Sequence, residues 1–253
     1  MRFERRLYVA ACLLVMFFTA PWGTPAKAQE SGEAEVIRSI DAAVHARAEG
    51  IEGYLVIEHY AVFRNNDEVT PAAEMRVKTI YRKSTGKTYI VLSESGSELL
   101  RKMVLRELLN NEKKINLPEN REASWITSAN YEMKLRPGGA QRLDGRDCYV
   151  LDITPKRKAP NMIDGTLWVD AKDGSIIQIQ GIASKSVSVF TGPTQMMRQY
   201  TSVNGFAMAT HARAVADSTL FGRTVVKIDY QDYGVQLVPP NKVVPANQVV
   251  PPK

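Results

Sequence analysis

The feature that most constrains the fold is a long succession of short strand-like segments between residues 131 and 233. These segments are rich in Val, Ile, Tyr, Thr and Phe, and residues typical of turns separate them. Asp173-Gly174 and Asn204-Gly205 are the strongest turn signals, because such dipeptides favour the tight hairpins that join antiparallel strands. Contiguous hairpins favour one antiparallel sheet over a parallel α/β fold, in which helices alternate with strands. The predicted strands are residues 131–136, 147–154, 165–171, 175–183, 186–190, 196–203, 206–215 and 224–233.

The preceding part of the chain adds two amphipathic helices and three strands to this meander. Residues 33–48 carry apolar side chains at spacings of three and four, which predicts a helix that ends at Gly50. Ser97 is a good N-cap for a second helix that extends to about residue 113. The three strands are predicted at residues 53–64, 72–82 and 87–94.

Alternation within residues 72–82 indicates which face of the sheet is covered. Met75, Val77, Thr79 and Tyr81 alternate with charged side chains, as in a sheet with one wet face and one covered face. The predicted fold class is therefore mainly β (α+β), a continuous antiparallel sheet with helices across one face. Its predicted extent is residues 29–237, followed by a Pro-rich extended tail at residues 238–253.

The first 28 residues have the pattern of a secretory signal. Three arginines precede an uninterrupted apolar run at residues 7–20, whereas a membrane-spanning helix needs about 20 residues. Ala26-Lys27-Ala28 matches the small-x-small cleavage pattern, so we expect cleavage after Ala28 and a periplasmic location. A retained anchor and a lipid-modified Cys12 are the alternative interpretations.

Composition and motifs argue against several classes of function. Beyond residue 28 the chain holds 29 basic and 26 acidic side chains, so a nucleic-acid partner is not expected. The three histidines, His45, His59 and His211, have no metal-ligand spacing, and no metal or cofactor is predicted. Cys148, the only cysteine beyond the leader, lies in a strand-like run and is expected to be a buried apolar residue. The chain is therefore not expected to be an enzyme.

Two runs of the sequence resemble a known family. Residues 144–156 read DGRDCYVLDITPK and residues 165–179 read GTLWVDAKDGSIIQI. Both runs resemble the outer-membrane lipoprotein-sorting proteins, the periplasmic LolA-like carriers, in which a strand ends in Pro-Lys and a Leu-Trp-Val-Asp strand turns through Asp-Gly. The resemblance is best over residues 140–235. No position here matches the arginine that locks the lid in that family.

The resemblance implies a fold, a ligand class and partners. The fold would be a curved antiparallel half-barrel, open at the side, with helices covering its concave face. Lipid or lipoprotein acyl chains would lie between the sheet and the helices, since each buried methylene contributes about 0.8 kcal/mol. An inner-membrane transporter and an outer-membrane acceptor are the candidate protein partners of such a carrier.

Strand alternation then provides a candidate lining for the acyl-chain cavity. These are apolar and aromatic side chains at inward positions of the predicted strands: Met75, Val77, Tyr81, Tyr89, Val91, Tyr149, Leu151, Ile153, Leu167 and Val169. The alternative function is an envelope-assembly or stress-sensing module that binds a protein partner, with docking through the tail or the basic residues 156–158. An exported enzyme that uses one of the three histidines is a further alternative.

Overall fold

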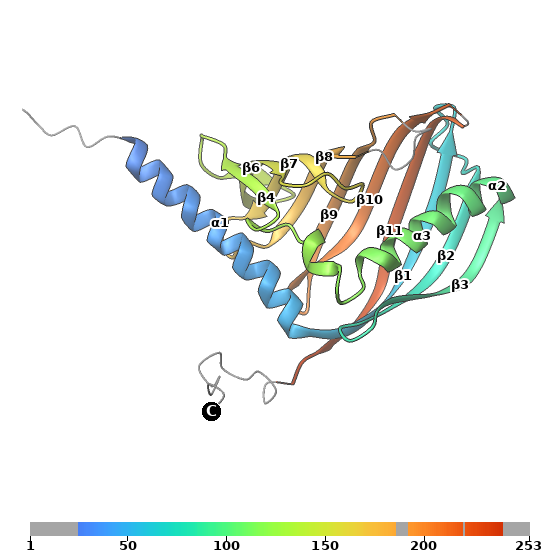
Figure 1. Cartoon of the computed structure of the whole chain (residues 1–253), viewed down its shortest axis with the longest axis horizontal. Helices are drawn as coiled ribbons and strands as arrows, with labels where there is room; N and C mark the ends of the chain where they lie inside the picture. The colour runs from blue at the N-terminus through green and yellow to red at the C-terminus, as the bar shows by residue number, and fades with distance from the viewer. Residues whose placement is uncertain (1–24, 186–191, 220, 240–253) are drawn as a thin grey trace, which may run out of the picture.

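The computed structural model describes residues 25–185, 192–219 and 221–239, and most of them form one antiparallel sheet (Figure 1). The described residues give eleven strands in the order β3-β2-β1-β11-β10-β9-β8-β7-β6-β4, and β5 pairs with β6. The strands are β1 (Ile51–Arg64), β2 (Ala73–Arg82), β3 (Gly86–Gly96), β4 (Tyr131–Leu135), β5 (Gln141–Leu143), β6 (Arg146–Pro155), β7 (Ile163–Asp170), β8 (Ile176–Ala183), β9 (Gln195–Val203), β10 (Phe206–Ser218) and β11 (Gly222–Leu237).

The predicted fold class is confirmed, since the sheet is antiparallel and open and its helices lie on one face. The turn predicted at Asn204-Gly205 joins β9 to β10, and both residues have the positive φ that this hairpin requires. The strand predicted at residues 186–190 lies outside the described residues. One described strand was not predicted: β5 pairs with β6 across Asp144-Gly145, a second turn with two positive φ values.

Pairing between the two ends of the sequence makes the sheet continuous. β1 is paired with β2 on one side and with β11 on the other, so the N-terminal three strands extend the long meander. Register shifts interrupt the β1–β11, β2–β3, β7–β8 and β9–β10 pairings. Because bulges bend strands and increase their twist, these irregularities account for the curvature of the sheet.

Two helical segments lie on the concave face of the sheet (Figure 1). α1 (Pro25–Gly50) begins eight residues before the predicted start of the first helix and ends at the predicted Gly50. The second segment comprises α2 (Glu98–Leu100), a π-helical turn η1 (Arg101–Leu105) and α3 (Arg106–Ile115). Its predicted N-cap is confirmed, because the Ser97 side chain accepts a hydrogen bond from the Leu100 N–H. A short 3₁₀ turn, η2 (Arg121–Ser124), follows.

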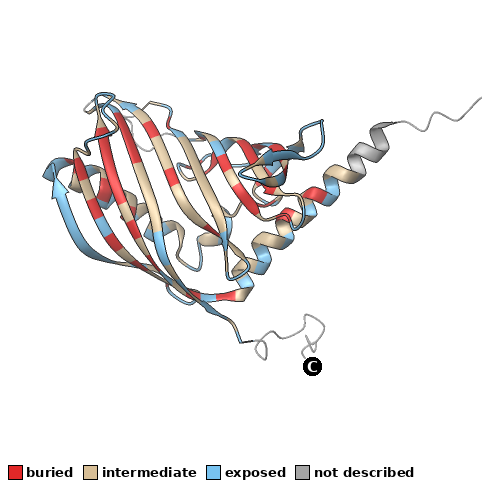
Figure 2. Ribbon diagram, turned by 180° about the vertical axis from the view of Figure 1, so that it is seen from behind, coloured by how far each residue is buried: buried red, intermediate tan, exposed pale blue. Residues whose placement is uncertain are grey.

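No helix of the described residues lies on the opposite face of the sheet (Figure 2). A small apolar cluster of Ala61, Phe63, Val215 and Val225 lies on this face, with the Lys227 ammonium 4.7 Å from the centre of the Phe63 ring. Among the described helices, none is both long and apolar enough to cross a membrane. The predicted leader up to residue 24 and the predicted tail from residue 240 lie outside the described residues.

Candidate functional site

Helix α1 covers an apolar cluster at the β4 end of the concave face. Val36 and Ile40 of α1 are buried against strands β4 and β6 to β8. Two contacts fasten the helix there: the Asp41 carboxylate accepts hydrogen bonds from Ser128, and Glu33 accepts one from the Leu135 N–H. The buried strand residues of this cluster are Tyr131, Leu151, Ile153, Ile163, Leu167, Val169, Ile176 and Ile179.

The segment from α2 to α3 covers a second apolar cluster at the β3 end. Leu100, Leu105 and Leu109 are buried against strands β1, β2 and β11. Leu105 and Leu109 are one helical turn apart, so one stripe of the segment faces the sheet. The buried strand residues of this second cluster are Tyr60, Val62, Ala73, Met75, Val77 and Val226.

Glu112 of α3 contacts two basic side chains that come from strands on either side of the second cluster. The Lys87 Nζ of β3 lies 2.8 Å from one Glu112 carboxylate oxygen, and an Arg198 guanidinium nitrogen of β9 lies 3.7 Å from the other. Asn116 also donates a hydrogen bond to this carboxylate at 3.3 Å. We call Lys87, Glu112 and Arg198 the charged bridge.

The charged bridge strongly perturbs the proton affinity of its members. Burial alone would raise the pKa of Glu112, but Lys87, Arg198 and the hydrogen bonds of Lys87 and Asn116 lower this pKa to about 2. Burial would lower the pKa of Lys87, yet Glu112 and nearby tyrosines raise it well above its ordinary value. Both groups therefore stay charged across the physiological pH range, and the bridge holds α3 onto the sheet.

A buried carboxylate lies near the charged bridge. Glu58 of β1 is buried, and its carboxylate accepts a 2.5 Å hydrogen bond from the buried Tyr60 hydroxyl. Burial, followed by the charge of Glu58, raises the pKa of Tyr60 well above its ordinary value. The Tyr60 hydroxyl therefore keeps its proton at neutral pH and donates it in the hydrogen bond to Glu58.

Further tyrosines surround these groups. The Tyr54 ring stacks on Tyr81 with 4.9 Å between ring centres, and Tyr233 lies 6.0 Å from Tyr54. Burial raises the pKa of Tyr54, Tyr230 and Tyr233, so their hydroxyls remain protonated at neutral pH. This part of the sheet thus offers aromatic rings and neutral hydroxyls rather than a purely apolar surface.

Eight of the ten residues predicted to line the cavity belong to the two apolar clusters. Their cross-strand pairs, such as Leu151 with Leu167 and Tyr149 with Val169, place them on the helix-covered face. Near α1 the structure brings together Tyr149, Leu151, Ile153, Leu167 and Val169. Near α2 and α3 it brings together Met75, Val77 and Tyr89, while Tyr81 stacks on Tyr54 and Val91 is partly exposed on β3. That these residues line a ligand cavity stays a prediction.

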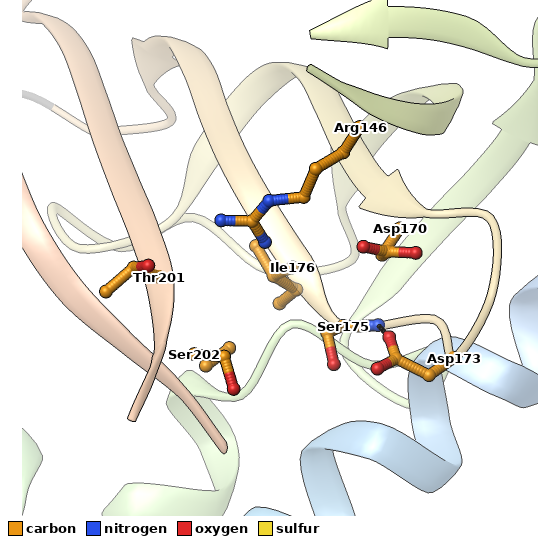
Figure 3. A pocket seen from close by; sticks show the side chains of 8 residues that line it. Arg146, Asp170, Asp173, Ser175, Ile176, Thr201 and Ser202 are labelled. Atoms are coloured by element: carbon orange, nitrogen blue, oxygen red, sulfur yellow. Dashed lines mark hydrogen bonds between the residues drawn. The ribbon is translucent and has the colours of Figure 1, made fainter. Parts of the chain in front are cut away.

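A small pocket lies beside the β7–β8 turn (Figure 3). It has a volume of about 70 Å³, and Arg146, Asp170 and Ser175 are among its lining residues. The Ser175 N–H donates to Asp173 within the same turn at 2.9 Å. A pocket of this size has room for a few water molecules and not for an acyl chain.

A second, wider pocket of about 390 Å³ lies over β7 to β10. It is lined by Gly165, Thr166, Gln180, Gly181, Ile182, Gln195, Met196, Met197 and Arg213. Amide, methionine and glycine residues contribute to its lining. Neither this pocket nor the smaller one includes any of the ten residues predicted to line the cavity.

The histidines do not come together in a cleft. His45 of α1 packs edge-on against Trp125, whereas His59 and His211 form pairs with Glu74 and Asp229. Among the described residues, no group of three or more His, Cys, Asp or Glu side chains could hold a metal ion. Cys148 is fully buried and free, as its predicted apolar role requires.

Sequence reasoning missed the charged bridge and Glu58. Glu58 occupies an inward position in an alternating run of Tyr54, Val56, Tyr60 and Val62, so a charge within an apolar stripe was the available signal. Lys87 and Arg198 had no such signal, because their common partner Glu112 comes from a helix whose placement on the sheet is set by tertiary packing.

Comparisons with known proteins find similarity at the level of structure. No family model matches the sequence, and no curated protein is similar to it. A domain described as an outer-membrane lipoprotein-sorting protein from Vibrio parahaemolyticus aligns with 80% of this chain and 93% of its own, at 13% identity and a TM-score of 0.46.

Two further solved structures are similar over the same extent. A LolA superfamily protein from Nitrosomonas europaea aligns with 82% of this chain and 94% of its own, at 12% identity and a TM-score of 0.41. A DUF1329 family protein from Desulfovibrio piger aligns with 82% of this chain and 92% of its own, at 14% identity and a TM-score of 0.40. The similar solved structures thus include lipoprotein-sorting and LolA superfamily proteins.

Proposed function

We propose that this protein is an exported carrier that binds lipid or lipoprotein acyl chains between the concave face of its sheet and its helices. The carrier would act in the periplasm, after cleavage of the leader at Ala28, in lipoprotein sorting or envelope lipid transport. The observation that carries the proposal is an open sheet whose concave face is apolar at both ends and lies under helices. When a helix moves away from such a face, the apolar surface that it covered becomes available to bind a ligand.

Apolar side chains at the rim of the sheet support the same function. Val91 on the edge strand β3 and Leu99 and Met103 on the helical segment after it are 40% to 56% exposed. Exposed apolar groups next to an apolar interior are typical of the mouth of a ligand site. A carrier does not need a catalytic group, because burial of an acyl chain supplies the binding free energy.

A fluorescent apolar probe, N-phenyl-1-naphthylamine, tests the proposal on residues 29–253. We expect the protein to bind the probe at micromolar concentration and to release it when palmitate or phospholipid is added. Val91→Glu should weaken probe binding at least fivefold, because it places a charge at the rim. Val69→Glu is the matched control, since Val69 is 89% exposed in a loop. A folded protein that binds neither probe nor lipid would contradict the proposal.

The edge strand β3 favours the alternative function, a module that binds a protein partner. Ile90, Val91 and Leu92 are consecutive and all exposed, and among the described strands β3 pairs with β2 alone. An unpaired apolar edge is a template for an added strand from another chain. In that case Ile90→Lys, which leaves the concave face unchanged, would abolish partner capture and spare probe binding.

A further inference from the structure

The face of β1 to β3 that points away from the helices carries exposed apolar side chains. Leu55 and Ile90 occupy positions that alternate with residues of the helix-covered face, and they are 41% and 50% exposed. Leu55 is opposed to Ile80 in the β1–β2 register, and Ile90 is opposed to Lys78 in the β2–β3 register. These side chains therefore form one patch on the outer surface of the sheet.

Leu92 extends this patch along the outermost strand. The β2–β3 register passes from Arg76 opposite Ser93 to Val77 opposite Val91, so Leu92 has no opposed residue and lies in a bulge. Its side chain is 51% exposed, and β3 is exposed along most of its length (Figure 2). A bulge makes an edge strand a poor template for an added strand. The exposed apolar side chains therefore fit contact with a surface better than backbone pairing with another chain.

Three basic side chains lie on the same outer face. Arg76, Lys78 and Arg82 of β2 alternate with residues of the helix-covered face. Among the described residues, none of these three side chains forms an ion pair. Glu74, an acidic residue on this face of β2, is instead paired with His59 at 3.1 Å. The patch therefore combines exposed apolar groups with positive charge that no ion pair of the described structure neutralises.

This combination of side chains is typical of a surface that binds an anionic membrane. Basic groups attract the anionic headgroups, and apolar groups enter the boundary between the headgroups and the acyl chains. We propose that the patch docks the protein on a bilayer that contains anionic phospholipid. This docking face comprises the three basic side chains together with Leu55, Ile80, Ile90 and Leu92. It lies on the outer side of the sheet, opposite the proposed ligand site, so the inference goes beyond the carrier function.

The test measures the binding of residues 29–253 to phospholipid vesicles by co-sedimentation. Phosphatidylcholine vesicles are compared with equimolar vesicles of phosphatidylcholine and phosphatidylglycerol. We expect binding to the anionic vesicles to be at least about tenfold tighter, because each basic side chain near an anionic surface adds to the attraction. This preference should shrink at a salt concentration of about 1 M, where the screening length is about 3 Å.

Charge reversal on the docking face should remove the preference for anionic vesicles. In Arg76→Glu combined with Lys78→Glu, we expect the affinity for these vesicles to fall at least about tenfold. Lys134→Glu combined with Lys172→Glu is the matched control, because it changes the net charge equally at exposed positions in β4 and in the β7–β8 turn. The control should bind the anionic vesicles almost as tightly as the unaltered protein. Circular dichroism checks that both variants are folded.

Leu92→Trp reports whether the docking face enters the bilayer. We expect its emission, compared with that of the unaltered protein, to shift to shorter wavelength on anionic vesicles. Bromine-labelled lipid in the same vesicles should quench this emission. Ile182→Trp is the matched control, since Ile182 is 48% exposed on β8, six strands away from β3 in the sheet. The emission of this control should not respond to vesicles.

The outcomes separate this inference from the carrier function. Equal binding to both kinds of vesicle would overturn the inference, and no binding to either would overturn it in favour of a protein partner at this edge. Equal loss of binding in the two charge-reversal variants, or vesicle binding that leaves Leu92→Trp emission unchanged, would also overturn it. Uptake of the apolar probe is measured separately on the unaltered protein. Its failure would contradict the carrier function and not the docking face.

Discussion

Lys87 and Arg198 stand five strands apart in the sheet, yet both reach the carboxylate of Glu112, at 2.8 and 3.7 Å. In a flat sheet five strand spacings would separate them by about 24 Å. The sheet is therefore curved strongly enough that the Glu112 side chain of α3 contacts residues of both β3 and β9. Glu112 therefore holds α3 onto the sheet, and its two contacts depend on the curvature of the sheet.

Glu112→Gln should destabilise the protein in a pH-dependent way. The pKa of Glu112 is about 2 in the folded protein and near 4.5 in the unfolded chain, so its stabilisation is complete above pH 4.5. This contribution is at most about 3 kcal/mol and is lost as the pH falls towards 2. Urea unfolding at pH 7 and pH 3 measures the difference between the two proteins. Glu107→Gln on the exposed face of α3 is the control, and a pH-independent difference for Glu112→Gln would contradict the account.

Tyr60→Phe should lower the free energy of unfolding by about 1–3 kcal/mol, because it removes the hydroxyl that donates a hydrogen bond to the buried Glu58 carboxylate. Glu58→Gln should cost less, since an amide oxygen can still accept from Tyr60 and no buried charge remains. Thermal unfolding of both variants gives the ranking. The reverse order would mean that Glu58 has a stronger partner than Tyr60.

Asp41→Ala should loosen α1 selectively. The Asp41 carboxylate accepts hydrogen bonds from the Ser128 N–H at 2.8 Å and from the Ser128 hydroxyl at 2.5 Å. Hydrogen exchange should become faster in α1 and stay unchanged in α3, and probe uptake should become faster if α1 covers the ligand. Uniformly faster exchange across the sheet would instead indicate global destabilisation.

Gly165→Ala should disrupt the pairing of β7 with β8. A Cβ on Gly165 would lie 2.2 Å from the Gln180 carbonyl oxygen, a backbone atom that cannot move aside. The melting temperature should fall by several degrees. Gly32→Ala is the control, because a Cβ there meets nothing within 4 Å and alanine favours the helix. An unchanged melting temperature for Gly165→Ala would show that the strands can separate at little cost.

Most of the sheet could be predicted from the sequence because its strands are joined by local turns. Alternation defined β2, and Asn204-Gly205 defined the β9–β10 hairpin, since both signals lie within a few residues. The pairing of β1 with β11 joins residues that are 160 to 186 positions apart and has no local signal.

The candidate site was less predictable for the same reason. Inward positions such as Leu151 and Val77 follow from alternation, but their separation into two clusters depends on where α1 and α3 cross the sheet. The charged bridge depends on curvature, which arises from bulges that the sequence pattern does not reveal. Short β5 was missed because three residues are too few for a periodic signal.

The most direct measurement is mass spectrometry of organic extracts of residues 29–253, purified from the periplasm without detergent. The account predicts about one molecule of lipid or lipoprotein per protein. A lipid-free protein that also fails to take up the apolar probe would contradict the carrier function and favour a partner-binding module.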